Sequence, residues 1–289
     1  MGITVIIPAF NEENCIRKTL IQVENILKNS PIPEYEIIVI DDGSTDNTQK
    51  EIQLSKVDCN LIVHKVNRGY GFTLKTGIRN ARFGNIAITD ADDTYPNDRI
   101  PELYKYFMKK KLDMLVGSRT GQNVSYPFIK KIPKFFIKAL AQYICRREIP
   151  DINSGLRIFK KHIALKFFTL YPDGFSFTLT ITLAMLVKSY EVEYMPIDYF
   201  QRIGKSKIRP IRDTIRFFNL LGRIAFYFNP LRFIMPFVVI MGLLSFSILT
   251  YDVFIRHDLS SSSVLLPSLT LNLLFLGLIA DLIVKKFGD

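Results

Sequence analysis

The sequence predicts an α/β fold built on a mainly parallel β-sheet with helices on both faces, followed by a transmembrane hairpin. Two observations predict the sheet: short apolar runs alternate with helical stretches, and the first run is apolar throughout, as in a strand buried on both faces. A third observation predicts the hairpin, because two long uncharged segments lie near the end of the 289-residue chain.

The first part of the chain carries five strand patterns and, between them, helical patterns. The strand patterns lie at 3–10, 36–40, 61–64, 86–89 and 114–117, and helical patterns lie at 14–29 and 71–83. Ligands of parallel sheets bind at the carboxyl ends of the strands. Polar residues that follow three of these strands are therefore expected along one rim. They are Asn11, Asp41, Asp42, Asp90 and Asp92.

An acidic run, Asp90-Ala91-Asp92-Asp93, follows the strand at 86–89 directly. Acids clustered at the end of a strand either lie in water at a turn or hold a cation. A hard cation held there could neutralise a diphosphate leaving group. Asp93 is expected to face water, and the run by itself leaves both interpretations open.

Two segments near the end of the chain have the length and composition of membrane spans. Phe233 to Tyr251 is a run of 19 residues without a charge, and Val264 to Ala280 is a run of 17. Each is near the ~20 residues that cross a bilayer as a helix. A buried core helix is the alternative for the shorter run. The pair predicts a hairpin with spans at about 232–252 and 264–284.

The net charge of +11 is concentrated before the first apolar segment. Between Tyr199 and Arg232 there are eight basic residues and one acid, Asp213. A membrane surface explains this better than nucleic acid does, because the apolar segments follow at once. Arginines alternate with aromatic residues and leucines over 211–228, which predicts an amphipathic helix in the headgroup region; an ordinary surface helix is the alternative.

Basic residues on both outer flanks of the hairpin place the two chain ends and the main domain in the cytoplasm. The predicted organisation has three parts: a cytoplasmic domain, an interfacial helical segment and the hairpin, at 1–209, 210–229 and 230–289. The three cysteines and three histidines are far apart in the sequence, which predicts free thiols and argues against a zinc or histidine metal site.

Four motifs in the first hundred residues recur in the same order in the inverting glycosyltransferases of family 2, which have the GT-A fold. They are Ile7–Glu13 (IPAFNEE), Asp41–Asp46 (DDGSTD), Asn67–Gly71 (NRGYG) and Asp90–Asp92 (DAD). Three later motifs resemble the polyprenyl-phosphate hexosyltransferases, the group that contains dolichol-phosphate mannose synthase and undecaprenyl-phosphate glucosyltransferases. They are Gly117–Arg119 (GSR), Asp151–Arg157 (DINSGLR) and Arg202–Lys207 (RIGKSK).

The resemblance covers nearly the whole chain and implies an enzyme. Such an enzyme transfers a hexose from a UDP- or GDP-sugar to a polyprenyl phosphate, undecaprenyl or dolichyl, with inversion and with Mg²⁺ or Mn²⁺, at the cytoplasmic face of the membrane. The implied partners are the nucleotide sugar, the lipid phosphate and the bilayer, with no nucleic acid. A homo-oligomer is compatible with the sequence.

The resemblance assigns the donor nucleotide to residues of the first four motifs. They are Pro8, Phe10, Glu12, Asp41, Asp42, Gly69, Asp90 and Ala91. Carboxylates can accept hydrogen bonds from a base or ribose, and glycines at 69 and 71 would let the nucleotide come close. A plain β-turn is the alternative for the 42–44 segment, and a helix-entry loop is the alternative for 67–71.

The resemblance makes Asp92 the direct metal ligand and Asp90 a partner of the ribose or the metal. The family often has Gln two positions after the second Asp, where this chain has Thr94. A hydroxyl is a weaker ligand, so the third protein ligand is in doubt and a water could take its place.

The resemblance assigns catalysis to Asp151, Arg119 and Arg157, with Asp151 as the usual base. A polyprenyl phosphate has a second pKa of about 6 and is already anionic near neutral pH, so positioning the two anions is the larger task. The alternative for Asp151 is an ion pair with Arg157. The family often has an acid near 175–178, where this chain has Thr178, Thr180 and Thr182 instead, so no role is assigned there.

The acceptor phosphate is assigned to three cations of the last motif, Arg202, Lys205 and Lys207. The alternative is a basic stripe bound to anionic lipid, and one segment can serve both purposes. Competing functions are a family 2 transferase with another acceptor and a catalytically idle membrane scaffold. A processive polysaccharide synthase is disfavoured, because those enzymes carry a QxxRW motif and this chain has no tryptophan.

Overall fold

The computed structural model describes residues 2–121, 131–174, 176–200, 219–220 and 222–287, with the backbone alone for 131–137 and 287. The chain divides into two compact units, Met1–Ile215 and Arg216–Asp289, and each is described by itself.

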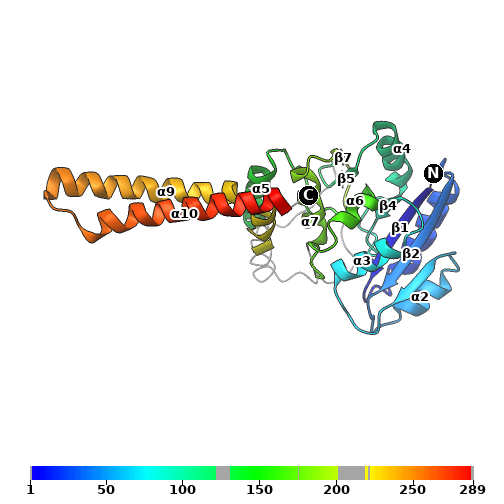
Figure 1. Ribbon diagram of the computed structural model, residues 1–289. Coiled ribbons are helices and arrows are strands. Elements are labelled where there is room, and N and C mark those ends of the chain that lie inside the picture. Colours follow the sequence, from blue (N-terminus) through cyan, green and yellow to red (C-terminus); the bar gives the residue numbers. More distant parts are fainter. Residues whose placement is uncertain (1, 122–130, 175, 201–218, 221, 288–289) are drawn as a thin grey trace. The chain divides into compact units, whose positions relative to one another are not determined.

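Within the described residues, the first unit is centred on a seven-stranded sheet (Figure 1). The strands are β1 (Gly2–Ala9), β2 (Glu34–Asp41), β3 (Asn60–Val63), β4 (Asn85–Ile88), β5 (Met114–Ser118), β6 (Arg157–Lys160) and β7 (Val192–Pro196). Their order is β3-β2-β1-β4-β6-β5-β7, and β6 is antiparallel to both of its neighbours while the other pairs are parallel. The predicted mainly parallel sheet is confirmed.

Helices cover both faces of this sheet, as the sequence predicts (Figure 1). They are α1 (Ile16–Lys28), α2 (Thr48–Leu54), α3 (Tyr70–Asn80), α4 (Ile100–Lys110), α5 (Lys131–Cys145), α6 (Lys161–Lys166) and α7 (Phe177–Val187). On one face, Leu20 of α1 and Phe107 of α4 share a core cluster with Val5 of β1. On the other, α3 packs so closely that a Cβ on Gly77 would lie 2.7 Å from Ile6 Cγ2.

The register of the sheet decides which loops meet. All eight residues of β1 are buried, which explains its continuous apolar sequence. In the antiparallel β4–β6 pair, Ile88 at the end of β4 lies opposite Arg157 at the start of β6. The loop that follows β4 and the loop that precedes β6 therefore reach the same edge of the sheet.

The second unit contains a helical hairpin. It consists of α9 (Pro230–Tyr251), a π-helical turn (Asp252–Arg256) and α10 (Ser261–Phe287). The two helices pack together, and Ser245 Oγ lies 3.3 Å from Thr270 Oγ1 between them. At about 1.5 Å per residue, the 22 residues of α9 are long enough to span the ~30 Å hydrocarbon core of a bilayer.

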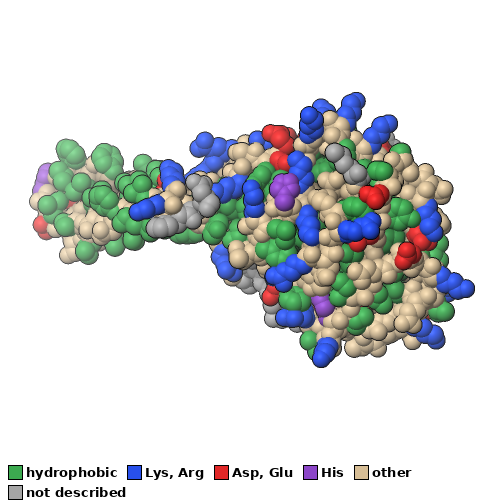
Figure 2. Space-filling view, turned by 45° about the vertical axis from the view of Figure 1, so that its right-hand side comes forward, with side chains coloured by type: hydrophobic (Ala, Val, Ile, Leu, Met, Phe, Trp, Pro, Cys, Tyr) green, Lys and Arg blue, Asp and Glu red, His purple; other side chains and the backbone are tan. Residues whose placement is uncertain are grey.

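The outer surface of the hairpin is hydrophobic (Figure 2). Phe246 and Leu282, for example, are 67% and 66% exposed. Both helices are long and apolar enough to cross a membrane, and the candidate spans are Pro230–Arg256 and Ser261–Lys286. Exposed apolar surface of this extent marks contact with lipid or with another protein. The segment predicted as an interfacial helix, 210–229, is described only at 219–220 and 222–229, where 219–220 and 222–228 are helical.

Candidate active site

Within the described residues, several loops that carry predicted site residues meet at one edge of the sheet. β1, β2, β4 and β5 all end at this edge, and the antiparallel β6 begins there. We call residues 89–97 the acidic loop and residues 151–156 the pre-β6 loop.

The segments after β1 and β2 are joined by hydrogen bonds. Asn11 N donates to Ser44 Oγ at 2.9 Å, and Thr45 N donates to Asn11 Oδ1 at 2.8 Å. Glu12 N donates to Thr48 Oγ1 at 2.8 Å. The two motifs therefore form one surface at the end of the sheet. Of the predicted nucleotide contacts on the β1 side, Phe10 and Glu12 are half-buried, whereas Pro8 is buried inside β1.

Asp41 and Asp42 are buried, and each carboxylate fixes the backbone near it. Asp41 accepts from Ser44 N at 3.1 Å and from Gln49 Nε2 at 2.6 Å. Asp42 accepts from the N–H of Arg68 at 3.0 Å and from that of Gly69 at 2.8 Å. In this conformation the two acids shape the turns of the rim.

His64, which looked isolated in the sequence, is a partner of Asp42. Its Nδ1 lies 2.7 Å from Asp42 Oδ1, and its Nε2 lies 3.1 Å from Thr76 Oγ1. The contact is long-range, because β3 delivers His64 to the end of β2, and no local sequence signal marks it.

The glycines of the NRGYG motif are explained by a protein contact. Gly71 N donates to Gly174 O at 3.1 Å, and Phe72 N donates to Asp173 O at 2.9 Å, so the 172–174 loop caps the start of α3. Gly69 has φ of 98°, and a Cβ there would lie 2.7 Å from Asp173 O. The close approach expected for a nucleotide is made by this loop, and the nucleotide contact of Gly69 stays a prediction.

Gly71→Ala should destabilise the first unit. A Cβ at Gly71 would overlap the carbonyl oxygen of Pro172, and a backbone atom cannot rotate away. We expect a loss of about 1–3 kcal/mol of unfolding free energy, as for other overpacked sites, seen as a lower melting temperature by circular dichroism. Gly84→Ala is the matched control, since its Cβ would meet nothing within 4 Å. Equal melting temperatures for the two variants would contradict the cap.

The acidic loop is supported along its length. Asp90 Oδ1 accepts from Tyr70 Oη at 3.1 Å, and the Ala91 carbonyl accepts from Thr19 Oγ1 at 3.1 Å. Asp92 Oδ1 accepts from the hydroxyl of Thr94 at 2.7 Å. Such supports hold a carboxylate in one orientation before a ligand binds.

The structure revises the expectation for Asp93 and gives Thr94 a role. Asp93 does not simply face water: its carboxylate is paired with Lys18 of α1, and its side chain is only 17% exposed. Thr94 is fully buried, and its hydroxyl is used to hold Asp92. In this conformation Thr94 is a support for Asp92 and does not offer a metal ligand.

The acidic loop fits a divalent cation that takes most of its ligands from elsewhere. Asp90 and Asp92 present two carboxylates from one short segment. Among the described residues, no cluster of three or more His, Cys, Asp and Glu could hold a metal. Mg²⁺ is commonly held by one or two carboxylates together with substrate phosphates and water, and these two aspartates match that pattern.

Asp151 and Arg119 form a bidentate ion pair at the same edge, and their side chains are only 10% and 11% exposed. Asp151 Oδ2 accepts from Arg119 Nε at 2.6 Å, and Oδ1 accepts from Nη2 at 2.8 Å. Burial raises the pKa of Asp151, but the hydrogen bonds and charge of Arg119 outweigh it and lower the pKa to about 2. A carboxylate with so low a pKa orients a cation better than it accepts a proton.

Arg157, the alternative partner of Asp151, lies inside the protein. It is fully buried and donates to the carbonyls of Ser154 and Thr178 and to Thr182 Oγ1. Burial lowers the pKa of this guanidinium. Without exposed surface, Arg157 holds the pre-β6 loop against α7 in this conformation, and its predicted catalytic role stays a prediction.

Three of the predicted residues, Arg202, Lys205 and Lys207, lie outside the described residues. Sequence reasoning also missed three tyrosines at this edge: Tyr70, Tyr95 and Tyr199. Their contacts join segments that are distant in the chain, so only the position of Tyr70 inside the NRGYG motif could have drawn attention to one of them.

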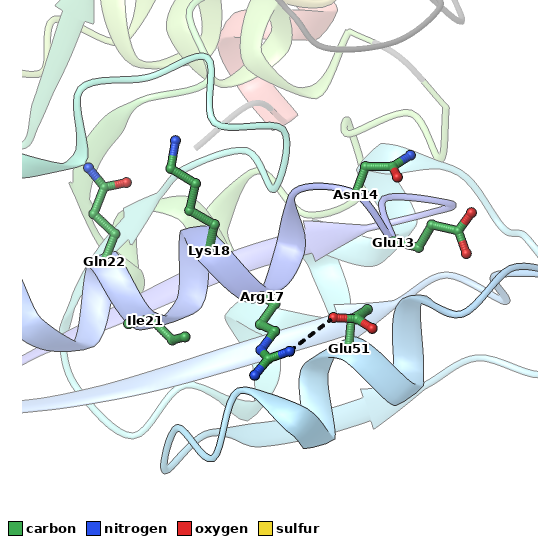
Figure 3. Close-up of a pocket in the computed structure, with 7 residues that line it drawn as sticks. All are labelled: Glu13, Asn14, Arg17, Lys18, Ile21, Gln22 and Glu51. Atoms are coloured by element: carbon green, nitrogen blue, oxygen red, sulfur yellow. Dashed lines mark ion pairs between the residues drawn. The ribbon is translucent and has the colours of Figure 1, made fainter.

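A second surface feature is an open pocket beside α1 (Figure 3). Charged side chains of both signs line it, including Lys18 and an Arg17–Glu51 pair at 3.9 Å. The pocket mixes charges and is open to solvent, so it shows no preference for one class of ligand.

Comparison with known families agrees with both units. Residues 4–168 match Glycosyl transferase family 2, and residues 229–285 match the GtrB C-terminal hairpin. The first match covers more than half of the chain.

Similar proteins come from archaea, eukaryotes and bacteria. The low-salt glycan biosynthesis hexosyltransferase Agl6 of Haloferax volcanii is 25% identical over 74% of this chain, but the chain spans only about half (51%) of that protein. The dolichyl-phosphate beta-glucosyltransferase of Dictyostelium discoideum is 26% identical over 78% of the chain and 74% of its own length. The dodecaprenyl-phosphate galacturonate synthase of Rhizobium johnstonii is 24% identical over 99% and 89%.

Solved structures show the same fold. The glucosyl-3-phosphoglycerate synthase of Mycobacterium tuberculosis in complex with uridine diphosphate has a TM-score of 0.59 at 16% identity, covering 78% of this chain and 80% of that one. The fold class predicted from the sequence is thereby confirmed, and with the family match over 4–168 the assignment follows. The chain belongs to glycosyl transferase family 2 and is a glycosyltransferase.

Proposed function

We propose that this protein transfers a hexose from a nucleoside diphosphate sugar to a polyprenyl phosphate, with inversion and with a divalent cation. The observation that carries the proposal is the meeting of two loops at one edge of the sheet: the acidic loop, with Asp90 and Asp92, and the pre-β6 loop, with the Asp151–Arg119 pair. One loop suits a nucleoside diphosphate with its metal, and the other offers a cation for a second anion.

The donor nucleotide is proposed to lie on the surface formed by the segments after β1 and β2. Phe10 and Glu12 are partly exposed there, whereas Asp41 and Asp42 shape the turns from within. Asp90 and Asp92 would hold Mg²⁺ or Mn²⁺, which neutralises charge that develops on the diphosphate leaving group. A glucosyl-3-phosphoglycerate synthase with this fold was solved with Mn²⁺ and uridine diphosphate, which supports the use of such a cation.

On the acceptor side, Arg119 is proposed to hold a phosphate oxygen while Asp151 fixes the orientation of the guanidinium. An oxygen of the lipid phosphate attacks the anomeric carbon, and a new C–O bond forms on the face opposite the nucleotide. The bond to the nucleoside diphosphate breaks, and its electron pair leaves with the diphosphate. No proton has to be removed from a doubly ionised phosphate, so the low pKa of Asp151 is compatible with the reaction.

The acceptor is proposed to be a polyprenyl phosphate because the second unit is a hairpin of two apolar helices that matches the GtrB C-terminal hairpin. Relatives over nearly the whole chain include a dodecaprenyl-phosphate galacturonate synthase. The basic flanks favour a cytoplasmic location of the first unit and of both chain ends, with Arg202, Lys205 and Lys207 near the acceptor phosphate.

The pH dependence of the transfer should follow the lipid phosphate. The pKa of Asp151 is held at about 2, so its charge is constant above pH 5, whereas the acceptor gains its second charge near pH 6. We expect kcat/KM for the acceptor to rise through about pH 6, and a phosphonate acceptor with a higher second pKa to shift this midpoint upward. Asp151→Asn should lower the rate without moving the midpoint. A pH profile whose midpoint moves in Asp151→Asn would instead support Asp151 as the general base.

The direct test is a screen of UDP- and GDP-sugars with polyprenyl phosphate, using the full chain in detergent and detecting lipid-linked sugar. A lipid-linked product that depends on Mg²⁺ or Mn²⁺ supports the proposal. Transfer to a different acceptor would instead support another family 2 activity. Failure to bind nucleoside diphosphate in the presence of Mn²⁺ would support an idle scaffold.

A further inference from the structure

Tyr95 lies between the acidic loop and the pre-β6 loop. It follows Thr94 in the acidic loop and is 3% exposed. Its hydroxyl oxygen accepts the N–H of Gly155 at 2.7 Å. Gly155 also faces Asp90, because a Cβ on Gly155 would lie 3.0 Å and 3.1 Å from the two carboxylate oxygens. Gly155 is therefore fixed by Tyr95 and packed against Asp90.

The ring of Tyr95 reaches the other end of the pre-β6 loop through a second tyrosine. The rings of Tyr95 and Tyr199 pack edge to face at 5.3 Å, and the Arg119 guanidinium lies 5.1 Å from the centre of the Tyr199 ring. Arg119 in turn holds Asp151. Tyr95 therefore contacts Gly155 directly and reaches Asp151 through two intervening side chains.

We propose that Tyr95 is a positioning residue that sets the separation between the donor-side carboxylates and the acceptor-side ion pair. The proposal rests on the proposed function in so far as the two loops hold the two substrates. Attack on the anomeric carbon needs the reacting atoms about 3–3.5 Å apart, and a displacement of about 1 Å can cost about a hundredfold in rate. A contact that joins the two loops is suited to hold this separation.

The hydroxyl, more than the ring, carries this role. Ser154 and Leu156 on either side of Gly155 are fully buried, so water cannot readily replace the hydroxyl as a partner of the Gly155 N–H. Tyr95→Phe keeps the ring and its packing on Tyr199 but removes this acceptor. The variant therefore separates the hydrogen bond from the packing.

Steady-state kinetics of the full-length protein test the proposal first. In Tyr95→Phe we expect kcat/KM for the acceptor to fall at least about tenfold, which corresponds to a loss of about 1.4 kcal/mol. The affinity for nucleoside diphosphate with Mn²⁺ should stay within about twofold of the wild-type value, because Asp90 and Asp92 keep their hydrogen bonds from the Tyr70 and Thr94 hydroxyls. Tyr106→Phe is the matched control: its hydroxyl donates to Glu193 at 2.7 Å, and we expect wild-type kinetics.

Amide hydrogen exchange provides a test that does not depend on the acceptor. A peptide covering the pre-β6 loop should exchange faster in Tyr95→Phe than in the wild type, and at the wild-type rate in Tyr106→Phe. Unchanged exchange in Tyr95→Phe, or equal losses in acceptor kcat/KM and nucleotide affinity, would overturn the proposal. If the wild type transfers nothing to polyprenyl phosphate, the proposed function fails, while the exchange rates still decide the role of Tyr95.

Discussion

Asp92→Ala should abolish metal-dependent transfer. The substitution removes a carboxylate that accepts a hydrogen bond from the Thr94 hydroxyl at 2.7 Å. The cation that would neutralise the diphosphate thereby loses one of its two proposed protein ligands. Loss of a single group that stabilises developing charge costs about 10²–10³ in kcat, and loss of a metal ligand should cost at least as much. The measurement is kcat at saturating nucleotide sugar over a range of Mn²⁺ concentrations.

Asp93→Asn is the matched control for this substitution. Asp93 lies next to Asp92, but its carboxylate pairs with Lys18, whose side chain is 72% exposed, and such pairs contribute little. Its φ of 57° is left-handed, a conformation that Asn tolerates well. We expect Asp93→Asn to keep most of the wild-type kcat. Wild-type turnover in Asp92→Ala, or equal losses in the two variants, would contradict the metal site.

Arg119→Ala should have the second large effect, on both activity and stability. The guanidinium is the proposed contact of the acceptor phosphate, and it is the partner of an Asp151 carboxylate whose side chain is only 10% exposed. Removal of one partner from a buried pair commonly costs about 3–5 kcal/mol, because the remaining charge is left uncompensated. We expect transfer to fall about 10²-fold or more and the melting temperature to fall with it.

Two further variants separate the catalytic loss from the folding loss. Arg119→Met combined with Asp151→Asn removes both charges, so stability should recover while activity stays low. Arg119→Lys keeps a charge but loses the two parallel hydrogen bonds, so activity should fall with a smaller loss of stability. If the double variant recovered activity together with stability, Arg119 would have only a structural role.

The sequence was sufficient for most of the parallel part of the sheet, because the first five strands are short and apolar and helical patterns at 14–29 and 71–83 separate some of them. The sequence analysis did not predict β6. This four-residue strand begins with the fully buried Arg157 and lies antiparallel between β4 and β5. The Arg157 guanidinium donates to the carbonyl of Thr178 in α7, a contact between segments 21 residues apart that no local periodicity encodes.

The candidate site divides in the same way. The acidic loop could be predicted because its residues are adjacent in the sequence. The pairing of Asp151 with Arg119, 32 residues away, could not be derived from spacing, and Arg157 was the open alternative. The capping of α3 by the 172–174 loop could not be predicted either. A glycine in the sequence indicates a close approach to the backbone, but it does not identify the group that approaches.

The antiparallel strand β6 has a consequence for how such enzymes can diversify. The strands β3, β2, β1 and β4 form a continuous parallel half that carries the motifs proposed to bind the nucleotide, and the pre-β6 loop meets this half at its border, where Gly155 packs against Asp90. Under the proposed function, exchange of the pre-β6 segment should change the acceptor while nucleotide recognition stays intact. The residues to preserve in such an exchange are Gly155 and Tyr95, whose hydrogen bond joins the pre-β6 loop to the acidic loop.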